Sequence, residues 1–135
     1  MGDAVNLASR LEGANKLFGT RVLLSEETHA RVQAEVCARR LGAVRVRGKQ
    51  RPTQVYELRH LGPPAAAEAD ALALFEAGVE AFGTRDFAQA EGHFQAVLRH
   101  WPEDGPTRRY LEEVAFLRLS PPGPDWDGAS TGVVK

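Results

Sequence analysis

The spacing of apolar residues changes along the chain, and each change predicts an element of secondary structure. In the first residues the apolar positions recur at helical spacing, and Asp3 precedes them where an N-cap would lie. The apolar positions of this predicted helix are Val5, Leu7, Ala8 and Leu11. The helix should end near Gly13, or near Gly19 after a further turn.

The following segment alternates between strand and helix patterns. Residues 21–25 form a short apolar run that predicts a buried strand. Ser25 is placed to cap a second helix, which we expect to run through Val32 and Val36. Alternation at residues 40–47 and 54–58 predicts two half-buried strands, joined by the basic turn 47–52. The predicted order is helix, strand, helix, strand, strand, an α+β arrangement.

The second half of the chain has a helical period throughout. Prolines and alanines at residues 62–69 predict a linker, and residues 70–119 predict helices at about 70–82, 87–100 and 105–119. The proline-rich residues 120–135 predict an extended tail without regular structure. The predicted domains are therefore residues 1–61 and the helical segment.

The first two predicted helices of this segment have the spacing of one tetratricopeptide repeat (TPR). The matching positions are Leu74, Gly78, Ala90, Phe94 and Pro102. In this TPR-like hairpin, Gly78 lets the two helices approach and Ala90 fits between them. A single repeat cannot bury its own apolar face, so it needs a neighbouring element or another chain. Two interpretations stay open: docking of a protein partner, or a packing appendage.

Composition and charge narrow the class of protein. Of 135 residues, 43% are hydrophobic and 26% charged, which is typical of a soluble globular protein. A net charge of -1 gives no general attraction to nucleic acid or to an anionic membrane. The single cysteine, Cys37, excludes an internal disulfide and fits a reducing compartment. No apolar run approaches the roughly 20 residues that span a bilayer, so we expect a cytoplasmic location without membrane insertion.

Asn6 and Arg10 are the first candidates for binding chemistry. They are four residues apart, so both project from one face of the first predicted helix. A guanidinium and an amide on one face suit an anionic, oxygen-rich ligand, because arginine offers forked donors to phosphate. The alternative from spacing alone is a solvated surface pair.

Several blocks of the sequence resemble class III adenylate and guanylate cyclases. Residues 2–12, Gly-Asp-Ala-Val-Asn-Leu-Ala-Ser-Arg-Leu-Glu, resemble the family segment G-D-x-V-N-x-A-x-R-L-E. The resemblance continues at residues 18–20, 22–25 and 46–49 and ends at the strand 55–58. These blocks occur in family order and spacing, which is more specific than a single motif. The resemblance implies the C-terminal part of a ferredoxin-like nucleotidyl cyclase domain.

The resemblance also implies roles for three residues. It makes Asn6 and Arg10 the catalytic pair that stabilises the transition state: Asn6 orients the ribose, and Arg10 meets the charge on the phosphates as pyrophosphate leaves. It places a basic residue on the substrate triphosphate, and this sequence has Arg47 at that position. The alternative for Arg47 is a solvated basic hairpin.

The metal half of the family site is not found in this sequence. The family uses two aspartates to hold Mg²⁺ or Mn²⁺, both well upstream of the Asn–Arg helix. The acidic residues near the candidate site show no metal-ligand spacing; they are Asp3, Glu12, Glu26 and Glu27. We therefore expect this chain to bind no metal alone and to be inactive alone toward ATP or GTP.

The resemblance further implies a site shared across a dimer interface, with the Asn–Arg pair from one subunit and the metal aspartates from the other. The partner would be a second copy or a complementing cyclase chain. Residues 121–128 resemble a P-P-x-x-D-W-D-G segment that follows the cyclase domain in some bacterial adenylate cyclases, many of which carry a membrane anchor. Two hypotheses remain: the C-terminal fragment of a cyclase, or a non-catalytic interaction module with a remnant cyclase fold.

Overall fold

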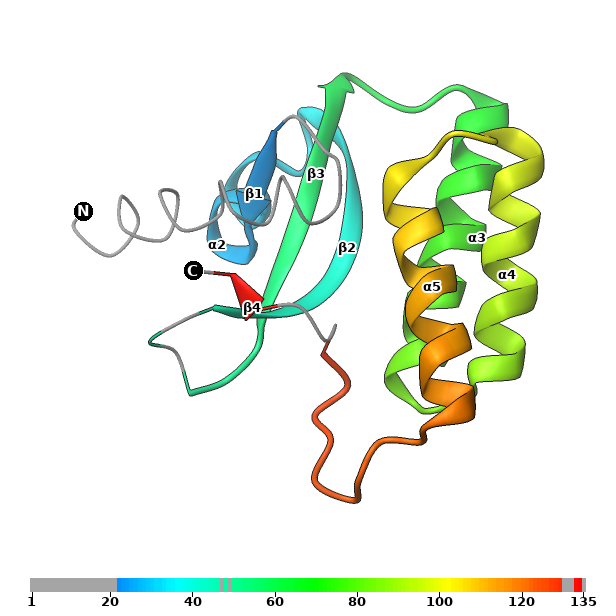
Figure 1. Ribbon diagram of the computed structural model, residues 1–135. Helices are drawn as coiled ribbons and strands as arrows, with labels where there is room; N and C mark the ends of the chain where they lie inside the picture. Colours follow the sequence, from blue (N-terminus) through cyan, green and yellow to red (C-terminus); the bar gives the residue numbers. More distant parts are fainter. Residues whose placement is uncertain (1–21, 47, 49, 130–132, 135) are drawn as a thin grey trace. The chain divides into compact units, whose positions relative to one another are not determined.

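The computed structural model describes residues 22–46, 48, 50–129 and 133–134 (Figure 1). The chain divides into two compact units, and each is described by itself. The first unit comprises Met1–Pro63 with Ser130–Lys135, and the second comprises Pro64–Ala129. The division between Pro63 and Pro64 falls within the predicted linker.

The first unit contains an antiparallel sheet and a short helix. Its described elements are β1 (Leu23–Ser25), α2 (Glu26–Val32), β2 (Val36–Val46), β3 (Thr53–Leu61) and β4 (Val133–Val134). The strand order is β1-β3-β2-β4, with β3 antiparallel to both β1 and β2, and β4 parallel to β2. Together with the helices of the second unit, this sheet confirms the predicted α+β class.

Helix α2 begins as predicted but ends earlier. The Ser25 side chain caps it by accepting a hydrogen bond from the Thr28 backbone N–H at 3.1 Å. The prediction that the helix continues through Val36 is wrong. The helix ends at Val32, and Val36 opens β2 opposite Leu61 of β3. A β-branched residue fits this ladder well, and pairing with β3 outweighs the local helical pattern.

Strand β2 begins before the predicted residue 40 and is irregular. Its register with β3 shifts between Cys37 and Ala38 and again between Arg40 and Gly42. Gly42 has a φ of 107°, a conformation that glycine adopts without steric cost. The fully buried apolar residues of the ladder are Leu41, Val44 and Val55. The irregularities therefore bend a strand whose apolar side chains still reach the core.

The second unit contains three helices, α3 (Ala66–Gly83), α4 (Phe87–His100) and α5 (Gly105–Leu119). The bounds of α4 and α5 agree with those predicted. Helix α3 starts at Ala66, so residues 66–69 belong to the helix and not to the predicted linker. An alanine-rich stretch has high intrinsic helix propensity, which explains the earlier start.

Side-chain caps set the starts of the last two helices. The Asp86 carboxylate accepts a hydrogen bond from the Gln89 N–H at 3.2 Å. The Asp104 carboxylate accepts from the Thr107 N–H at 3.2 Å and from its hydroxyl at 2.6 Å. Each cap satisfies a backbone donor that the first turn of a helix leaves without an intrahelical partner.

An aromatic cluster joins the three helices. The ring of Phe94 on α4 stacks on Tyr110 of α5 at 4.9 Å, and Phe75 of α3 meets both rings edge-on. Phe82, at the end of α3, also contacts Tyr110 at 5.0 Å. All four rings are buried. Helix α5 is therefore a neighbour that covers the apolar face of the α3–α4 hairpin.

The tail differs from the predicted extended segment. Residues 121–129 have no regular secondary structure, but Trp126 packs against Phe82 and Phe87 of the hairpin. Farther on, β4 pairs with Arg45 and Val46 of β2. An edge strand offers unpaired backbone groups, and a β-branched segment such as Val133–Val134 readily adopts the extended conformation that pairs with them.

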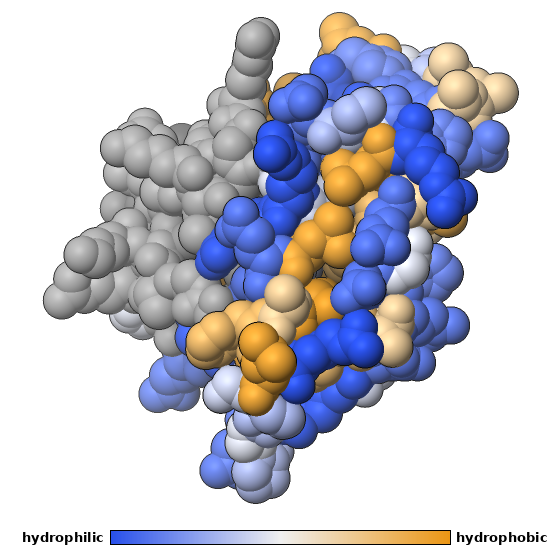
Figure 2. Space-filling view, turned by 45° about the vertical axis from the view of Figure 1, so that its right-hand side comes forward, coloured by the Kyte–Doolittle hydropathy of each residue, from blue (hydrophilic) through white to orange (hydrophobic). Residues whose placement is uncertain are grey.

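On the face shown in Figure 2, hydrophobic residues form patches among hydrophilic ones. The exposed large hydrophobic residues of the described chain are Val22, Leu61, Phe116 and Leu119. No helix within the described ranges is both long and apolar enough to cross a membrane.

Gly78 provides a test of the packing between α3 and α4. A Cβ atom at this position would lie 2.7–2.9 Å from three ring carbons of Phe94. Phe94 cannot yield easily, because its ring is held between Phe75 and Tyr110. We predict that Gly78→Ala lowers the free energy of unfolding by about 1–3 kcal/mol, measured by urea denaturation.

Gly92→Ala is the matched control, because Gly92 lies on α4 and a Cβ there meets no atom within 4 Å. This change should stabilise the protein by about 0.5–1 kcal/mol through helix propensity. Equal effects of the two substitutions would contradict the proposed close contact.

Candidate functional site

The residues predicted for the site lie outside the described part of the chain. Asn6 and Arg10 fall within residues 1–21, and Arg47 falls between β2 and β3. The described residues show the framework on both sides of Arg47 and the segment that follows the Asn6–Arg10 region.

The basic turn connects the ends of two well-paired strands. The last described antiparallel pair before it is Val44 with Thr53. Within the turn, Gly48 has a φ of 89°, a left-handed conformation that favours glycine. Arg51 is exposed. The β2–β3 ladder therefore projects this connection, which includes Arg47 in sequence, from a fixed pair of strands.

A buried charge pair anchors this ladder. Arg39 of β2 and Glu57 of β3 are direct cross-strand partners. The Arg39 guanidinium donates to Oε1 of Glu57 from Nε at 3.0 Å and from Nη2 at 2.8 Å. The Arg39 side chain is 1% exposed and that of Glu57 13%. Arg59 approaches the same oxygen with Nη1 at 3.4 Å. Two guanidinium groups thus surround one carboxylate.

This pair was not among the predicted site residues. Arg39 precedes the predicted strand 40–47, and Glu57 lies within the predicted strand 54–58. A charged residue in each of two strands that pair across a basic turn could have indicated an ion pair. The sequence did not give the register, however, because the two bulges in β2 shift it.

An aromatic contact attaches α2 to the sheet. The His29 ring stacks on Tyr56 of β3, with ring centres 3.8 Å apart and planes 4° apart. Tyr56 lies opposite Leu24 of β1 on one side and Arg40 of β2 on the other. The stack therefore ties α2 to the central strand of the antiparallel sheet.

Four carboxylates are described in the first unit: Glu26, Glu27, Glu35 and Glu57. Glu26 and Glu27 lie exposed in the first turn of α2, where negative charge favours the helix N-terminus. Glu27 pairs with Arg31 at 2.9 Å, and Glu57 is held by Arg39. Two-metal catalysis needs carboxylates that converge on both ions. Glu35 lies exposed between α2 and β2, and no three of these four carboxylates gather as metal ligands.

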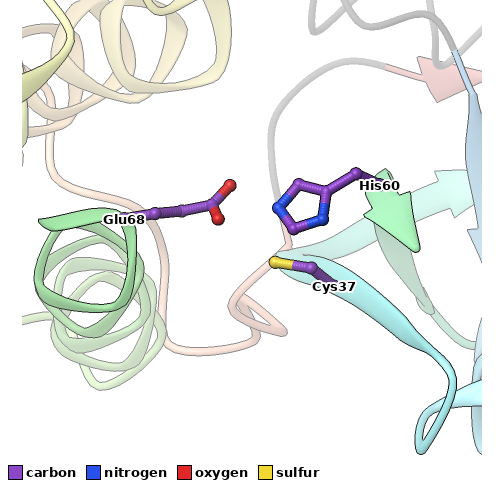
Figure 3. Close-up of side chains that lie close together, drawn as sticks. All are labelled: Cys37, His60 and Glu68. Carbon is purple, nitrogen blue, oxygen red and sulfur yellow. The ribbon is translucent and has the colours of Figure 1, made fainter. Parts of the chain in front are cut away.

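Cys37 and His60 are neighbours at the start of β2 and the end of β3. They are cross-strand partners, and Figure 3 shows both side chains. Glu68, which is also drawn, lies on α3 and belongs to the second unit. Two residues are fewer than the four ligands of a structural zinc site. Cys37 lies in a strand, and its position follows from pairing with His60.

Two curated proteins with sequence similarity to the chain are adenylate cyclases. "Adenylate cyclase 1" of Rhizobium meliloti (strain 1021) is 45% identical over 58 residues, which is 43% of this chain and 9% of that protein. The terminal-differentiation-specific adenylate cyclase of Dictyostelium discoideum is 27% identical over 117 residues, 83% of this chain and 6% of that protein. The chain is similar in sequence to adenylate cyclases.

The two matches cover different shares of this chain and a small share of each relative. The chain spans less than a tenth of the length of each relative. The match covering 83% of the chain is longer than either structural unit, so it includes residues of both. No protein-family model matches the chain, and no solved structure does.

The Arg39–Glu57 pair can be tested by substitution. Arg39→Ala leaves the Glu57 carboxylate without its main partner in a largely buried position. Loss of one member of a buried pair typically costs about 3–5 kcal/mol. We predict a loss of this size in the free energy of unfolding, measured by urea denaturation followed by circular dichroism.

The exposed Arg31–Glu27 pair of α2 is the control. Arg31→Ala should cost less than about 1 kcal/mol, because water screens an exposed pair. The double variant Arg39→Met with Glu57→Leu should recover most of the stability, since it removes both charges. If Arg39→Ala cost no more than Arg31→Ala, the pair would not anchor the ladder.

Proposed function

We propose that this chain is the C-terminal part of a class III nucleotidyl cyclase catalytic domain and supplies the transition-state half of a site shared between two subunits. The observation that carries the proposal is the 45% identity over 58 residues with an adenylate cyclase, together with the Asn–Arg motif of residues 2–12. The reaction would form a cyclic nucleotide from ATP or GTP, and this product would serve intracellular signal transduction.

In this proposal Asn6 and Arg10 act on the reacting atoms. Asn6 orients the ribose so that its 3′-hydroxyl faces the α-phosphate. Arg10 donates to phosphate oxygens as negative charge accumulates and pyrophosphate departs. Catalysis of this kind depends on donors placed in advance, because they need no reorganisation during the reaction.

Arg47 would bind the triphosphate from the basic turn. The β2–β3 ladder supports this role, since Arg39 and Glu57 fix the pairing of the strands from which the turn extends. A guanidinium offers a phosphate two parallel hydrogen bonds, whereas an ammonium acts as a point charge. A fixed hairpin would hold such a fork in one orientation.

The metal half would come from a partner. Mg²⁺ or Mn²⁺ in the family supports phosphoryl transfer by neutralising charge. The described carboxylates of the first unit do not fit such a centre, because Glu57 is paired with arginine and the other three, Glu26, Glu27 and Glu35, lie exposed. We therefore propose that the metal ligands come from a complementing cyclase chain, or from the second subunit of a homodimer whose chains include the upstream aspartates, and that this chain alone has no metal-dependent activity.

Complementation tests the catalytic pair. The partner is a cyclase subunit that keeps its metal aspartates but has its own Asn and Arg replaced by alanine. We predict that the wild-type chain restores Mn²⁺-dependent conversion of ATP or GTP. Asn6→Ala or Arg10→Ala should lower the restored kcat about 100-fold to 1,000-fold, because each removes a transition-state donor.

Arg31→Ala serves as the control in this assay, since Arg31 lies exposed on α2 and should leave the restored rate unchanged. Full activity of the wild-type chain without a partner would contradict the shared site. Restoration by the Asn6 and Arg10 variants at the wild-type rate would contradict the assigned roles.

In the same complementation assay, Arg47 should affect the KM for the nucleotide and not kcat. Loss of a charge-assisted phosphate contact made equally in substrate and transition state raises KM with little change in kcat. We predict that Arg47→Ala raises the KM for the nucleotide roughly 10-fold to 100-fold. Arg51→Ala, in the same turn, should change KM less than about 3-fold by comparison. Equal effects would indicate a general charge effect of the turn.

A non-catalytic interaction module is the second candidate. The observation in its favour is exposed apolar surface on α5, where Phe116 is 60% exposed and Leu119 89%. Exposed apolar side chains are individually common, so this observation has less weight than the cyclase similarity. Failure of complementation, with the chain folded and bound to the partner subunit, would favour this alternative.

A further inference from the structure

Residues 120–129 follow α5 and pack against the end of the α3–α4 hairpin. We call them the seated segment. Trp126 meets Phe82 of α3 at 5.4 Å and Phe87 of α4 at 5.7 Å between ring centres. Arg85, in the turn between the helices, lies over the indole at 5.5 Å. The hairpin thus forms a notch of two phenylalanines and one arginine, which we call the aromatic notch, and it holds one tryptophan.

Arg85 also holds the backbone of the seated segment. Its guanidinium donates to the Pro122 carbonyl at 3.2 Å and to the Gly123 carbonyl. Arg85 has a φ of 69°, a left-handed conformation that is costly for a residue with a Cβ. The hairpin turn therefore presents this guanidinium from a strained position, where it meets both a ring face and two carbonyl groups.

The residues beside Trp126 have their own structural requirements. The Asp127 carboxylate accepts a hydrogen bond from the Ala129 N–H at 3.0 Å, which forms a tight local turn. Gly128 has a φ of 81°, and a Cβ there would lie 3.3 Å from the Gly83 carbonyl oxygen. The sequence Trp-Asp-Gly is thus an inserted ring, a turn former and a residue that allows close backbone approach.

The packing of this segment leaves one polar group of Trp126 unsatisfied. The Nε1–H of Trp126 is buried without an acceptor among the described residues. A buried unpaired donor gives up a hydrogen bond that water would supply after release. Residues 120–125 are mostly exposed and proline-rich, with no helix or strand. Release of the segment therefore requires no element of regular structure to unfold.

We infer that the aromatic notch is a peptide-recognition site, and that the chain fills it with its own Trp126-Asp127-Gly128 segment. The chemistry it selects is an extended peptide with a tryptophan followed by aspartate and glycine. A tethered ligand has an effective concentration of about millimolar, so the chain's own segment excludes free peptide. This inference is independent of the proposed cyclase function and stands or falls separately.

The test uses the full chain and a fluorescein-labelled peptide with the sequence of residues 120–129. Trp126→Ala in the chain vacates the notch, and fluorescence anisotropy then measures peptide binding. We expect saturable binding to this variant, and binding to the wild-type chain at least about 10-fold weaker because its own segment competes. A peptide with alanine in place of tryptophan should bind neither chain.

Two further variants locate the site and protect the test against misfolding. Gly128→Ala keeps the tryptophan but strains the turn and crowds Gly83, so it should also admit the peptide. Adding Arg85→Ala to the Trp126→Ala chain should weaken peptide binding about 10-fold or more, since it removes two hydrogen bonds and the cation–π contact. Circular dichroism identifies variants that fold.

The inference is overturned by any of three results. Folded Trp126→Ala and Gly128→Ala chains that both fail to bind the peptide would show that the notch recognises no free segment. Equal binding to the wild-type chain would show that its own segment does not occupy the site. Binding that survives Arg85→Ala unchanged would place the peptide elsewhere.

Discussion

The pairing of β2 with β3 is the constraint on which the first unit depends. Arg39 and Glu57 lie opposite each other in this ladder, and the guanidinium is almost fully withdrawn from water. A buried charge without its partner is costly, so any register that separates these two residues is strongly disfavoured. The pair thus favours the observed register, which also buries Leu41, Val44 and Val55.

The β2–β3 register fixes the position of the turn that joins these two strands. The basic turn begins directly after β2 and ends before β3, and β4 pairs with β2 at Arg45 and Val46, next to Arg47. A phosphate-binding arginine in this turn would be supported by strands paired on both sides of the ladder. The chain is similar in sequence to adenylate cyclases, of which it spans less than a tenth of the length.

Contacts between aromatic rings join the three helices of the second unit. Phe94 occupies the space that Gly78 leaves, and Tyr110 brings α5 onto the hairpin. Aromatic contacts of this kind combine large buried area with a preferred geometry, so they align the helices as well as hold them. The same chemistry continues at the end of the hairpin, where Phe82 and Phe87 receive Trp126.

The sequence by itself determined the elements whose signals are local. The bounds of α4 and α5 and the cap at Ser25 could be predicted, because caps and helical periods are written within a few neighbouring residues. The resemblance in residues 2–12 likewise identified Asn6 and Arg10 as candidates. Only the tertiary structure decided that Val36 opens a strand, that Arg39 meets Glu57, that Trp126 fills a notch and that β4 joins β2. Each of these depends on a partner far along the chain, and the gain from burying or pairing two distant groups is not encoded in the local pattern of either one.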